Sequence, residues 1–109
     1  MEPTKLTDTL SVAGQVRPEE IEQLARAGFK AIICNRPDHE EPGQPDFAEV
    51  AAAAEAQGMK VRHIPVDASR TVEMQKDEFA RALAEMPGPV LAYCRTGNRC
   101  TLLHQAISG

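Results

Sequence analysis

The chain has 109 residues, which is enough for one domain around a single core but not for two. Hydrophobic residues make up 42% of it and charged residues 26%, and the formal net charge is −4. This acidic balance argues against nucleic acid or an anionic membrane as a partner, because both require a basic face.

The first half of the chain alternates between strand-like and helix-like segments. Residues 9–15 have the pattern of a short opening strand, and a helix is expected from Pro18 to Gly28, since proline favours a first helical turn and glycine an end. The β-branched run 29–35 is typical of a buried parallel strand. A loop with three prolines follows over residues 36–45.

The second half continues the alternation. The segments predicted there are a helix over 46–58, a strand over 59–66, a polar loop over 67–70, a helix over 71–86, a strand over 89–94 and a final helix beginning with 99–107. Asp46 and Glu49 have the spacing of a capping box, and Thr71 is the expected N-cap of the third helix.

This alternation predicts an α/β fold with a central parallel sheet of about four strands and flanking helices, because parallel neighbours need crossover connections. Functional sites in such sheets lie beyond the carboxyl ends of the strands. Loops 35–45, 67–71 and 94–99 are therefore expected to converge on one site. We treat residues 1–109 as a single domain, and we expect it to be a piece of a longer chain because it stops soon after its last helix begins.

The motif with the clearest chemistry is Cys-Arg-Thr-Gly-Asn-Arg at residues 94–99, between the last predicted strand and the last helix. A thiol at a helix N-terminus lies among backbone N–H groups that favour a thiolate and bind an anion beside it. Two nearby arginines are expected to lower the pKa of Cys94 further. The residues expected to bind the anion are Arg95, Thr96, Gly97, Asn98 and Arg99.

The cysteines indicate the compartment. There are three, at positions 34, 94 and 100, with no Cys-x-x-Cys pair, so neither a disulfide framework nor a zinc site is predicted. Reduced thiols favour a cytoplasmic location. The first ten residues lack the apolar core of a signal peptide, and no apolar run approaches a membrane span in length.

Two segments, AIICNRPDHEEPGQPDF and LAYCRTGNRC, resemble the bacterial family called beta-lactamase-hydrolase-like, phosphatase-like domain, and the likeness covers nearly the whole chain. The resemblance implies the cysteine-phosphatase α/β fold. It also implies a fused or neighbouring metallo-β-lactamase-type hydrolase related to persulfide dioxygenases. The active-site loop is similar to that of rhodanese sulfurtransferases, whose pattern Cys-Arg-x-Gly-x-Arg/Thr is met by Cys94, Arg95, Gly97 and Arg99.

Loop length separates the two chemistries that this resemblance implies. Tyrosine-phosphatase loops resemble Cys-x5-Arg, whereas only residues 95–98 separate Cys94 from Arg99, and Cys100 stands where a phosphatase has arginine. A shorter ring has one N–H donor fewer and suits a single sulfur better than a phosphoryl group. We therefore expect a sulfurtransferase that moves a sulfane sulfur from thiosulfate or a small persulfide through a Cys94 persulfide, with no metal or organic cofactor.

Four further residues each admit two interpretations. Cys100 is either a resolving thiol for an oxidised or persulfidated Cys94 or a small residue packed in the first helical turn. Cys34 is either near the pocket or part of the core. Arg36 is either a third cation of the site or a solvated loop residue. Asp67 resembles the general acid of dual-specificity phosphatases in position, but an aspartate that opens a loop also serves turn formation.

Two other functions therefore stay open. One is a cysteine-dependent phosphatase with Cys94 as nucleophile, Arg99 as clamp and Asp67 as acid. The other is a non-catalytic sensor of persulfides or anions.

Overall fold

The computed structural model of the protein describes residues 2–108. Its elements follow one another as β1 (Thr4–Lys5), β2 (Leu10–Ala13), a 3-10 turn (Pro18–Glu20), α1 (Ile21–Arg26), β3 (Ala31–Cys34), α2 (Phe47–Ala56), β4 (Lys60–His63), α3 (Val72–Glu85), β5 (Val90–Tyr93) and α4 (Asn98–Ser108). The strands form one sheet in the order β1-β2-β5-β3-β4. The expected α/β fold with four parallel strands and flanking helices is confirmed.

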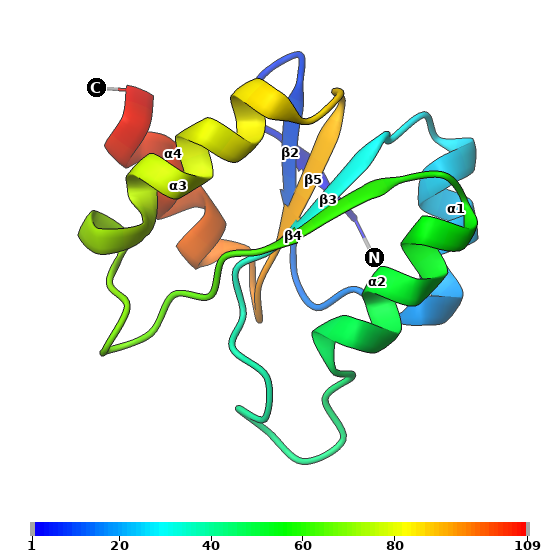
Figure 1. Cartoon of the computed structure of the whole chain (residues 1–109), viewed down its shortest axis with the longest axis horizontal. Coiled ribbons are helices and arrows are strands. Elements are labelled where there is room, and N and C mark those ends of the chain that lie inside the picture. The colour runs from blue at the N-terminus through cyan, green and yellow to red at the C-terminus, as the bar shows by residue number, and fades with distance from the viewer. Residues whose placement is uncertain (1, 109) are drawn as a thin grey trace.

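The sheet lies between two pairs of helices. Helices α1 and α2 cover one face, and α3 and α4 cover the other (Figure 1). Strands covered on both sides must be apolar on both sides, which is why β3 and β5 are buried along their whole length. Neighbouring residues of β3 illustrate this, since Ile32 packs towards α1 and α2 while Ile33 packs towards α3 and α4.

The fifth strand, β1, was not expected. It has two exposed residues and pairs antiparallel with β2, Thr4 opposite Val12 and Lys5 opposite Ser11. A segment this short carries no periodic pattern, so only the neighbouring strand makes it recognisable.

The expected helix starts are confirmed for α2 and α3. The Asp46 and Glu49 side chains form a reciprocal capping box at the start of α2, and the Thr71 hydroxyl accepts a hydrogen bond from the Met74 N–H. The first helix differs from expectation, because residues 18–20 form a 3-10 turn before α1 begins.

The parallel strands β2, β5, β3 and β4 run in register, so their carboxyl ends meet at one edge of the sheet. The loops that follow β3, β4 and β5 extend to this edge, at the bottom of the view in Figure 1. The three loops converge there as expected. Within residues 2–108, no helix has both the length and the hydropathy needed to cross a bilayer.

Candidate active site

Cys94 lies directly after β5, and the chain turns through residues 95–97 into α4. The turn requires a glycine, because Gly97 has a φ of 93° and a Cβ there would lie 3.4 Å from the Ala13 carbonyl oxygen. Gly14 allows the same approach from the other side, since a Cβ at Gly14 would lie 3.1 Å from the Arg95 carbonyl oxygen. Glycines on two separate segments thus let the loop pack tightly against the end of β2.

The loop surrounds the Cys94 sulfur with donors. The Gly97 N–H donates to Sγ over 3.0 Å. The pKa of Cys94 is lowered to about 5, first by a hydrogen bond from the Cys100 thiol, and also by the backbone N–H groups of Cys100, Thr96 and Arg99, against the opposing effect of burial. Cys94 is therefore a thiolate at neutral pH, as the sequence predicts, although its main support comes from a thiol and backbone groups rather than from arginine.

Cys100 lies in the first turn of α4 and is fully buried. Burial and the neighbouring Cys94 sulfur raise the pKa of Cys100, so this thiol keeps its proton and donates a hydrogen bond to the Cys94 thiolate. Cys100 therefore packs in the first helical turn, as one interpretation expects, and it also contacts the Cys94 sulfur, while its role as a resolving thiol stays a prediction.

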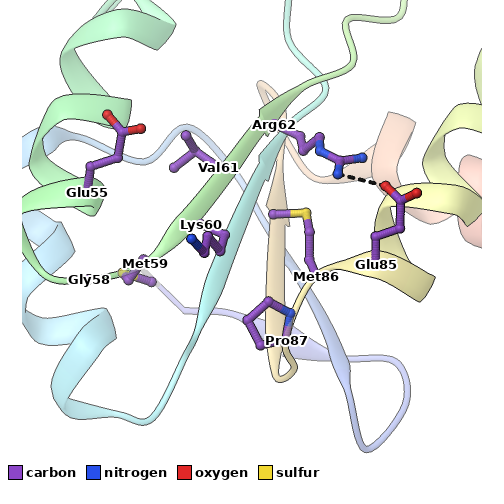
Figure 2. A pocket seen from close by; sticks show the side chains of 9 residues that line it. All are labelled: Glu55, Gly58, Met59, Lys60, Val61, Arg62, Glu85, Met86 and Pro87. Atoms are coloured by element: carbon purple, nitrogen blue, oxygen red, sulfur yellow. Dashed lines mark hydrogen bonds and ion pairs between the residues drawn. The ribbon is translucent and has the colours of Figure 1, made fainter.

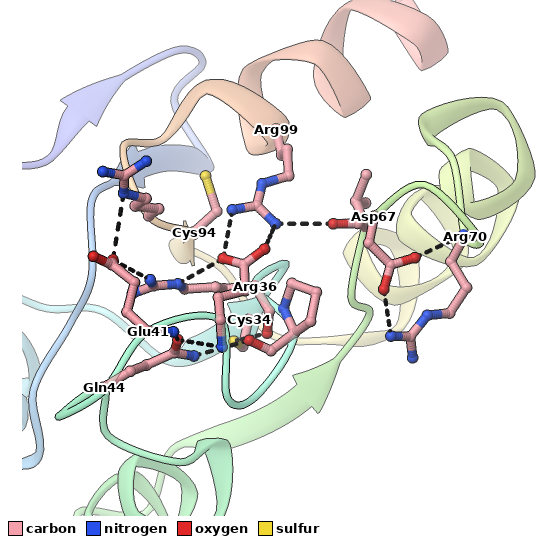
Figure 3. A network of polar contacts seen from close by, with 12 residues as sticks. Cys34, Arg36, Glu41, Gln44, Asp67, Arg70, Cys94 and Arg99 are labelled. Carbon is pink, nitrogen blue, oxygen red and sulfur yellow. Dashed lines mark hydrogen bonds and ion pairs between the residues drawn. The ribbon is translucent and has the colours of Figure 1, made fainter.

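Arg99 projects from α4 towards the loop after β3. Its two terminal nitrogens each donate to the Glu40 carboxylate over 2.9 Å, and Nη1 also donates to the Val66 carbonyl oxygen over 2.9 Å (Figure 3). The Arg99 side chain is 21% exposed. These contacts fix it beside Cys94 and tie together the loops after β3, β4 and β5.

Arg36 is buried where the loops converge and is not a solvated loop residue. Its side chain is only 3% exposed and uses all three nitrogens, Nε to Glu40 over 2.8 Å, Nη1 to Gln15 over 2.9 Å and Nη2 to Glu41. A buried arginine is stable only when it is paired in this way. Its carbonyl oxygen contacts the His63 ring, which stacks on Phe47 and so anchors the loop to α2.

Arg95 is the loosest of the three cations. Its side chain is 64% exposed and its Nε lies 3.4 Å from Glu41. It is therefore far more exposed than Arg36 and Arg99, whose side chains are 3% and 21% exposed.

Asp67 follows the end of β4 but directs its carboxylate away from Cys94. The carboxylate accepts hydrogen bonds from the Ser69 N–H and hydroxyl and from the Arg70 N–H and guanidinium (Figure 3). These contacts, the Arg70 side chain first, hold the pKa of Asp67 far below its ordinary value. Asp67 therefore stabilises the turn that it forms with Ser69 and Arg70, and its carboxylate is ionised.

Cys34 ends β3 on the other face of the sheet from Cys94, packed among the residues that face α1 and α2. Its thiol donates to the Arg36 carbonyl oxygen over 3.3 Å. Burial raises the pKa of Cys34 to about 11, so this residue is a neutral thiol of the core.

The sequence analysis missed Glu40 and Glu41. Both lie in the proline-containing loop after β3, where a pair of glutamates is an ordinary solvated sequence. Their contacts with Arg36 are local, but the contact of Glu40 with Arg99, 59 positions away, and that of Glu41 with Arg95 arise only when the fold brings two loops together. Three arginines at the converging ends of a sheet were the one available signal that carboxylates would be needed.

Away from Cys94, a hollow of about 480 Å³ opens beside β4 (Figure 2). Its lining includes the Arg62–Glu85 ion pair at 2.7 Å and the side chains of Met59 and Met86. It lies away from the three loops and holds no thiol. Across residues 2–108, no cluster of three or more His, Cys, Asp or Glu side chains is arranged to hold a metal ion.

The sequence of the chain is similar to those of known proteins. The family model described as "Beta-lactamase hydrolase-like protein, phosphatase-like domain" matches residues 4–108. A protein named Beta-lactamase hydrolase-like protein from Agrobacterium fabrum is 38% identical over 104 residues, and one of the same name from Xylella fastidiosa is 35% identical. Each match covers 95% of this chain and 24% of the relative, so the chain spans about a quarter of their length.

Solved structures share the fold. A Neisseria meningitidis protein with a provisional phosphatase name is 41% identical, has a TM-score of 0.85, and aligns over 96% of this chain and 77% of its own. The core catalytic domain of a PP-IP phosphatase from S. cerevisiae has a TM-score of 0.68 at 16% identity, over 93% of this chain and 61% of its own. The second likeness bears on the fold alone.

Proposed function

The chain belongs to the beta-lactamase hydrolase-like protein, phosphatase-like domain family, and we propose that it is a phosphatase-type hydrolase with Cys94 as its nucleophile. The observation that carries this proposal is the state of Cys94. Its sulfur lies at the start of α4, accepts the Gly97 N–H over 3.0 Å and has its pKa lowered to about 5. The phosphatase name of the relative at 41% identity supports the same class of reaction.

The proposed reaction has two steps. The Cys94 thiolate attacks the phosphorus of a phosphate monoester, the S–P bond forms, and the P–O bond to the leaving group breaks with the electron pair departing on that oxygen. Water then attacks phosphorus, the S–P bond breaks, and inorganic phosphate leaves while Cys94 returns to a thiolate. The N–H groups of residues 95–99 and the Arg99 guanidinium stabilise the oxygens in both transition states.

The leaving group decides which esters react. In the structure the Asp67 carboxylate is ionised and occupied by Ser69 and Arg70, so it does not hold a proton for a leaving oxygen. Aryl phosphates, whose leaving oxygens need no proton, are therefore the expected substrates.

The test is turnover of an aryl phosphate by the purified protein, with Cys94→Ser as the control. Rapid acid quenching followed by intact-mass measurement should show a phosphoryl group on wild type during turnover and none on Cys94→Ser. Steady release of phenol without Cys94 dependence, or no release at all, would contradict the proposal.

A second candidate is sulfur transfer, and one specific observation favours it. Only residues 95–98 separate Cys94 from Arg99, a shorter ring than the Cys-x5-Arg loop of tyrosine phosphatases. In this reaction the Cys94 thiolate attacks the sulfane sulfur of thiosulfate, an S–S bond forms, and sulfite leaves with the electron pair of the broken bond. A thiol acceptor then removes the sulfur from the Cys94 persulfide.

The two candidates differ in the mass they leave on Cys94. Incubation with thiosulfate should add one sulfur atom if sulfur transfer is correct, and nothing if the protein is a phosphatase alone. A stable sulfur adduct that no thiol acceptor removes, together with no hydrolysis of aryl phosphate, would indicate a sensor instead. We also propose that the domain works beside a hydrolase unit, since relatives with the hydrolase-like name extend well beyond the matched region.

A further inference from the structure

The Glu40 carboxylate occupies the position in which Arg99 would hold an anion. Arg99 presents two parallel N–H donors, and each reaches a different oxygen of Glu40 over 2.9 Å. This two-pronged geometry is the one by which arginine binds carboxylate, sulfate and phosphate oxygens. Glu40 Oε1 also accepts from Arg36 Nε over 2.8 Å, so the carboxylate bridges two arginines (Figure 3).

Glu41 is the second carboxylate that contacts the arginines of the site. It pairs with Arg36 and lies 3.4 Å from Arg95. The two carboxylates together contact all three arginines of the site, and a hollow of about 280 Å³ is lined by these five residues alone, Arg36, Glu40, Glu41, Arg95 and Arg99. Three cations thus face two carboxylates and the Cys94 thiolate, which leaves no surplus positive charge for an incoming dianion.

The loop that carries the two carboxylates is held in place by its own contacts. Gln44 Oε1 accepts from the backbone N–H groups of Glu40 and Glu41 over 3.0 and 3.3 Å, and Gln44 Nε2 donates to the Pro37 carbonyl oxygen over 2.8 Å. The N–H of Phe47, the first residue of α2, donates to Asp38 Oδ1 over 2.8 Å. A displaced Glu40 therefore stays close to the site.

We propose that Glu40 is a specificity-determining residue, a built-in competitor for Arg99 that disfavours doubly charged oxyanions. An anion that uses the Arg99 donors must displace the Glu40 carboxylate, and it then experiences repulsion from Glu40 and Glu41 that grows with its own charge. Singly charged groups are disfavoured less, and these include the monoanion that a phosphate monoester forms below its second pKa of about 6. The inference rests on the proposed reaction of Cys94 with an anionic substrate.

The opposite role for Glu40 makes the opposite prediction. A residue that only positions Arg99 would, once its charge is removed, leave Arg99 disordered and weaken anion binding. A competitor, once removed, frees the Arg99 donors and strengthens anion binding. The direction of the change therefore decides between the two roles.

The experiment measures how sulfate and nitrate protect Cys94 from alkylation by iodoacetamide, at constant ionic strength and near pH 6, where the buried Cys34 and Cys100 thiols stay protonated. Each variant is compared with its own rate without the anion. Glu40→Gln should lower the half-protecting concentration of sulfate about tenfold and that of nitrate by no more than about threefold. Adding Arg99→Ala to Glu40→Gln should remove the gain.

Glu85→Gln is the matched control, because it also breaks an arginine pair, with Arg62, at a place distant from Cys94. It should leave protection unchanged, and Glu41→Gln should give a smaller gain than Glu40→Gln. Weaker or unchanged protection in Glu40→Gln, or no protection in either wild type or Glu40→Gln, would overturn the proposal. Because alkylation needs no turnover, failure of the hydrolysis test is a separate outcome.

Discussion

The loop after β5 and the loop after β3 meet at the same site and control charge in different ways. Residues 96–100, at the end of the first loop and the start of α4, stabilise the Cys94 thiolate through backbone N–H groups and the buried Cys100 thiol. Residues 36–46 place the Glu40 and Glu41 carboxylates around three arginines, and these two side chains are 28% and 51% exposed.

The difference between the two loops separates the activation of Cys94 from the selection of anions. Backbone dipoles are little affected by salt, so the reactivity of Cys94 depends on the shape of the turn and on the buried Cys100 thiol. Charges on partly exposed side chains are screened by salt and removed by single substitutions. We therefore expect changes in the first loop to alter the chemistry and changes in the second to alter which anions enter.

Removing the nucleophile gives the largest expected effect. Cys94→Ser should lower turnover of the preferred substrate by about a thousandfold or more, since an alcohol is far less readily ionised than a thiol. Hydrolysis of aryl phosphate and sulfur uptake from thiosulfate should both be measured. Residual activity within tenfold of wild type would show that the reaction does not use this sulfur.

Gly97→Ala tests whether the shape of the turn fixes the reactivity. A Cβ at a φ of 93° is strained and would contact the Ala13 carbonyl oxygen, so we expect a loss of about 1–2 kcal/mol in the free energy of unfolding. The N–H of residue 97 should also shift from Sγ, which raises the pKa of Cys94 and lowers turnover by about tenfold to a hundredfold.

Gly28→Ala is the control for strain alone. Gly28 has a φ of 102°, and a Cβ there would meet nothing within 4 Å. It should cost stability in the same manner while the alkylation rate of Cys94 and turnover stay at wild-type values. An equal loss of activity in both variants would show that strain, and not the donor to Cys94, causes the effect.

The pH dependence of Cys94 alkylation tests how much the Cys100 thiol stabilises the Cys94 thiolate. The thiolate of Cys94 should persist down to about pH 5 and disappear as the pH falls through that value. Cys100→Ala removes the thiol donor, so the midpoint of Cys94 alkylation should rise by about one pH unit, whereas Cys100→Ser keeps a donor and should shift it less. Coincident midpoints in wild type and Cys100→Ala would show that the N–H groups suffice.

Asp67→Asn has the smallest expected effect. Because the carboxylate is occupied by Ser69 and Arg70, turnover of an aryl phosphate with a good leaving group should stay within about twofold of wild type. A general acid in use would cost about a hundredfold or more, most of all for poor leaving groups. Turnover of a series of aryl phosphates of rising leaving-group pKa distinguishes an Asp67 that acts as general acid from one that does not.

The sequence predicted the parts of the molecule whose signal is local. The apolar strands, the capping residues Asp46 and Thr71, and the Cys94 motif at the start of α4 all follow from short patterns, and each is confirmed. The resemblance to the phosphatase-like domain family is confirmed as well, whereas the sulfur-transfer activity inferred from loop length stays a proposal.

What escaped prediction depends on distant contacts. The role of Glu40 requires that the loop after β3 reach α4, and the role of Gly14 requires that β2 pass behind the Cys94 loop. The effect of Cys100 was left open because a helical period does not show whether a buried side chain also touches a neighbouring sulfur. Such contacts are set by packing, which short-range patterns do not encode.

Strand β4 ends the order of the sheet, so its outer edge has no strand beside it within the described chain. An open edge is a template on which a second molecule can add and begin an aggregate. Lys60 is exposed on this short strand, and a charged lysine on an edge strand disfavours pairing with another copy. Pro65, just beyond the strand, has no N–H with which to lengthen it. Both features of β4 therefore disfavour edge-to-edge association of two copies of the chain.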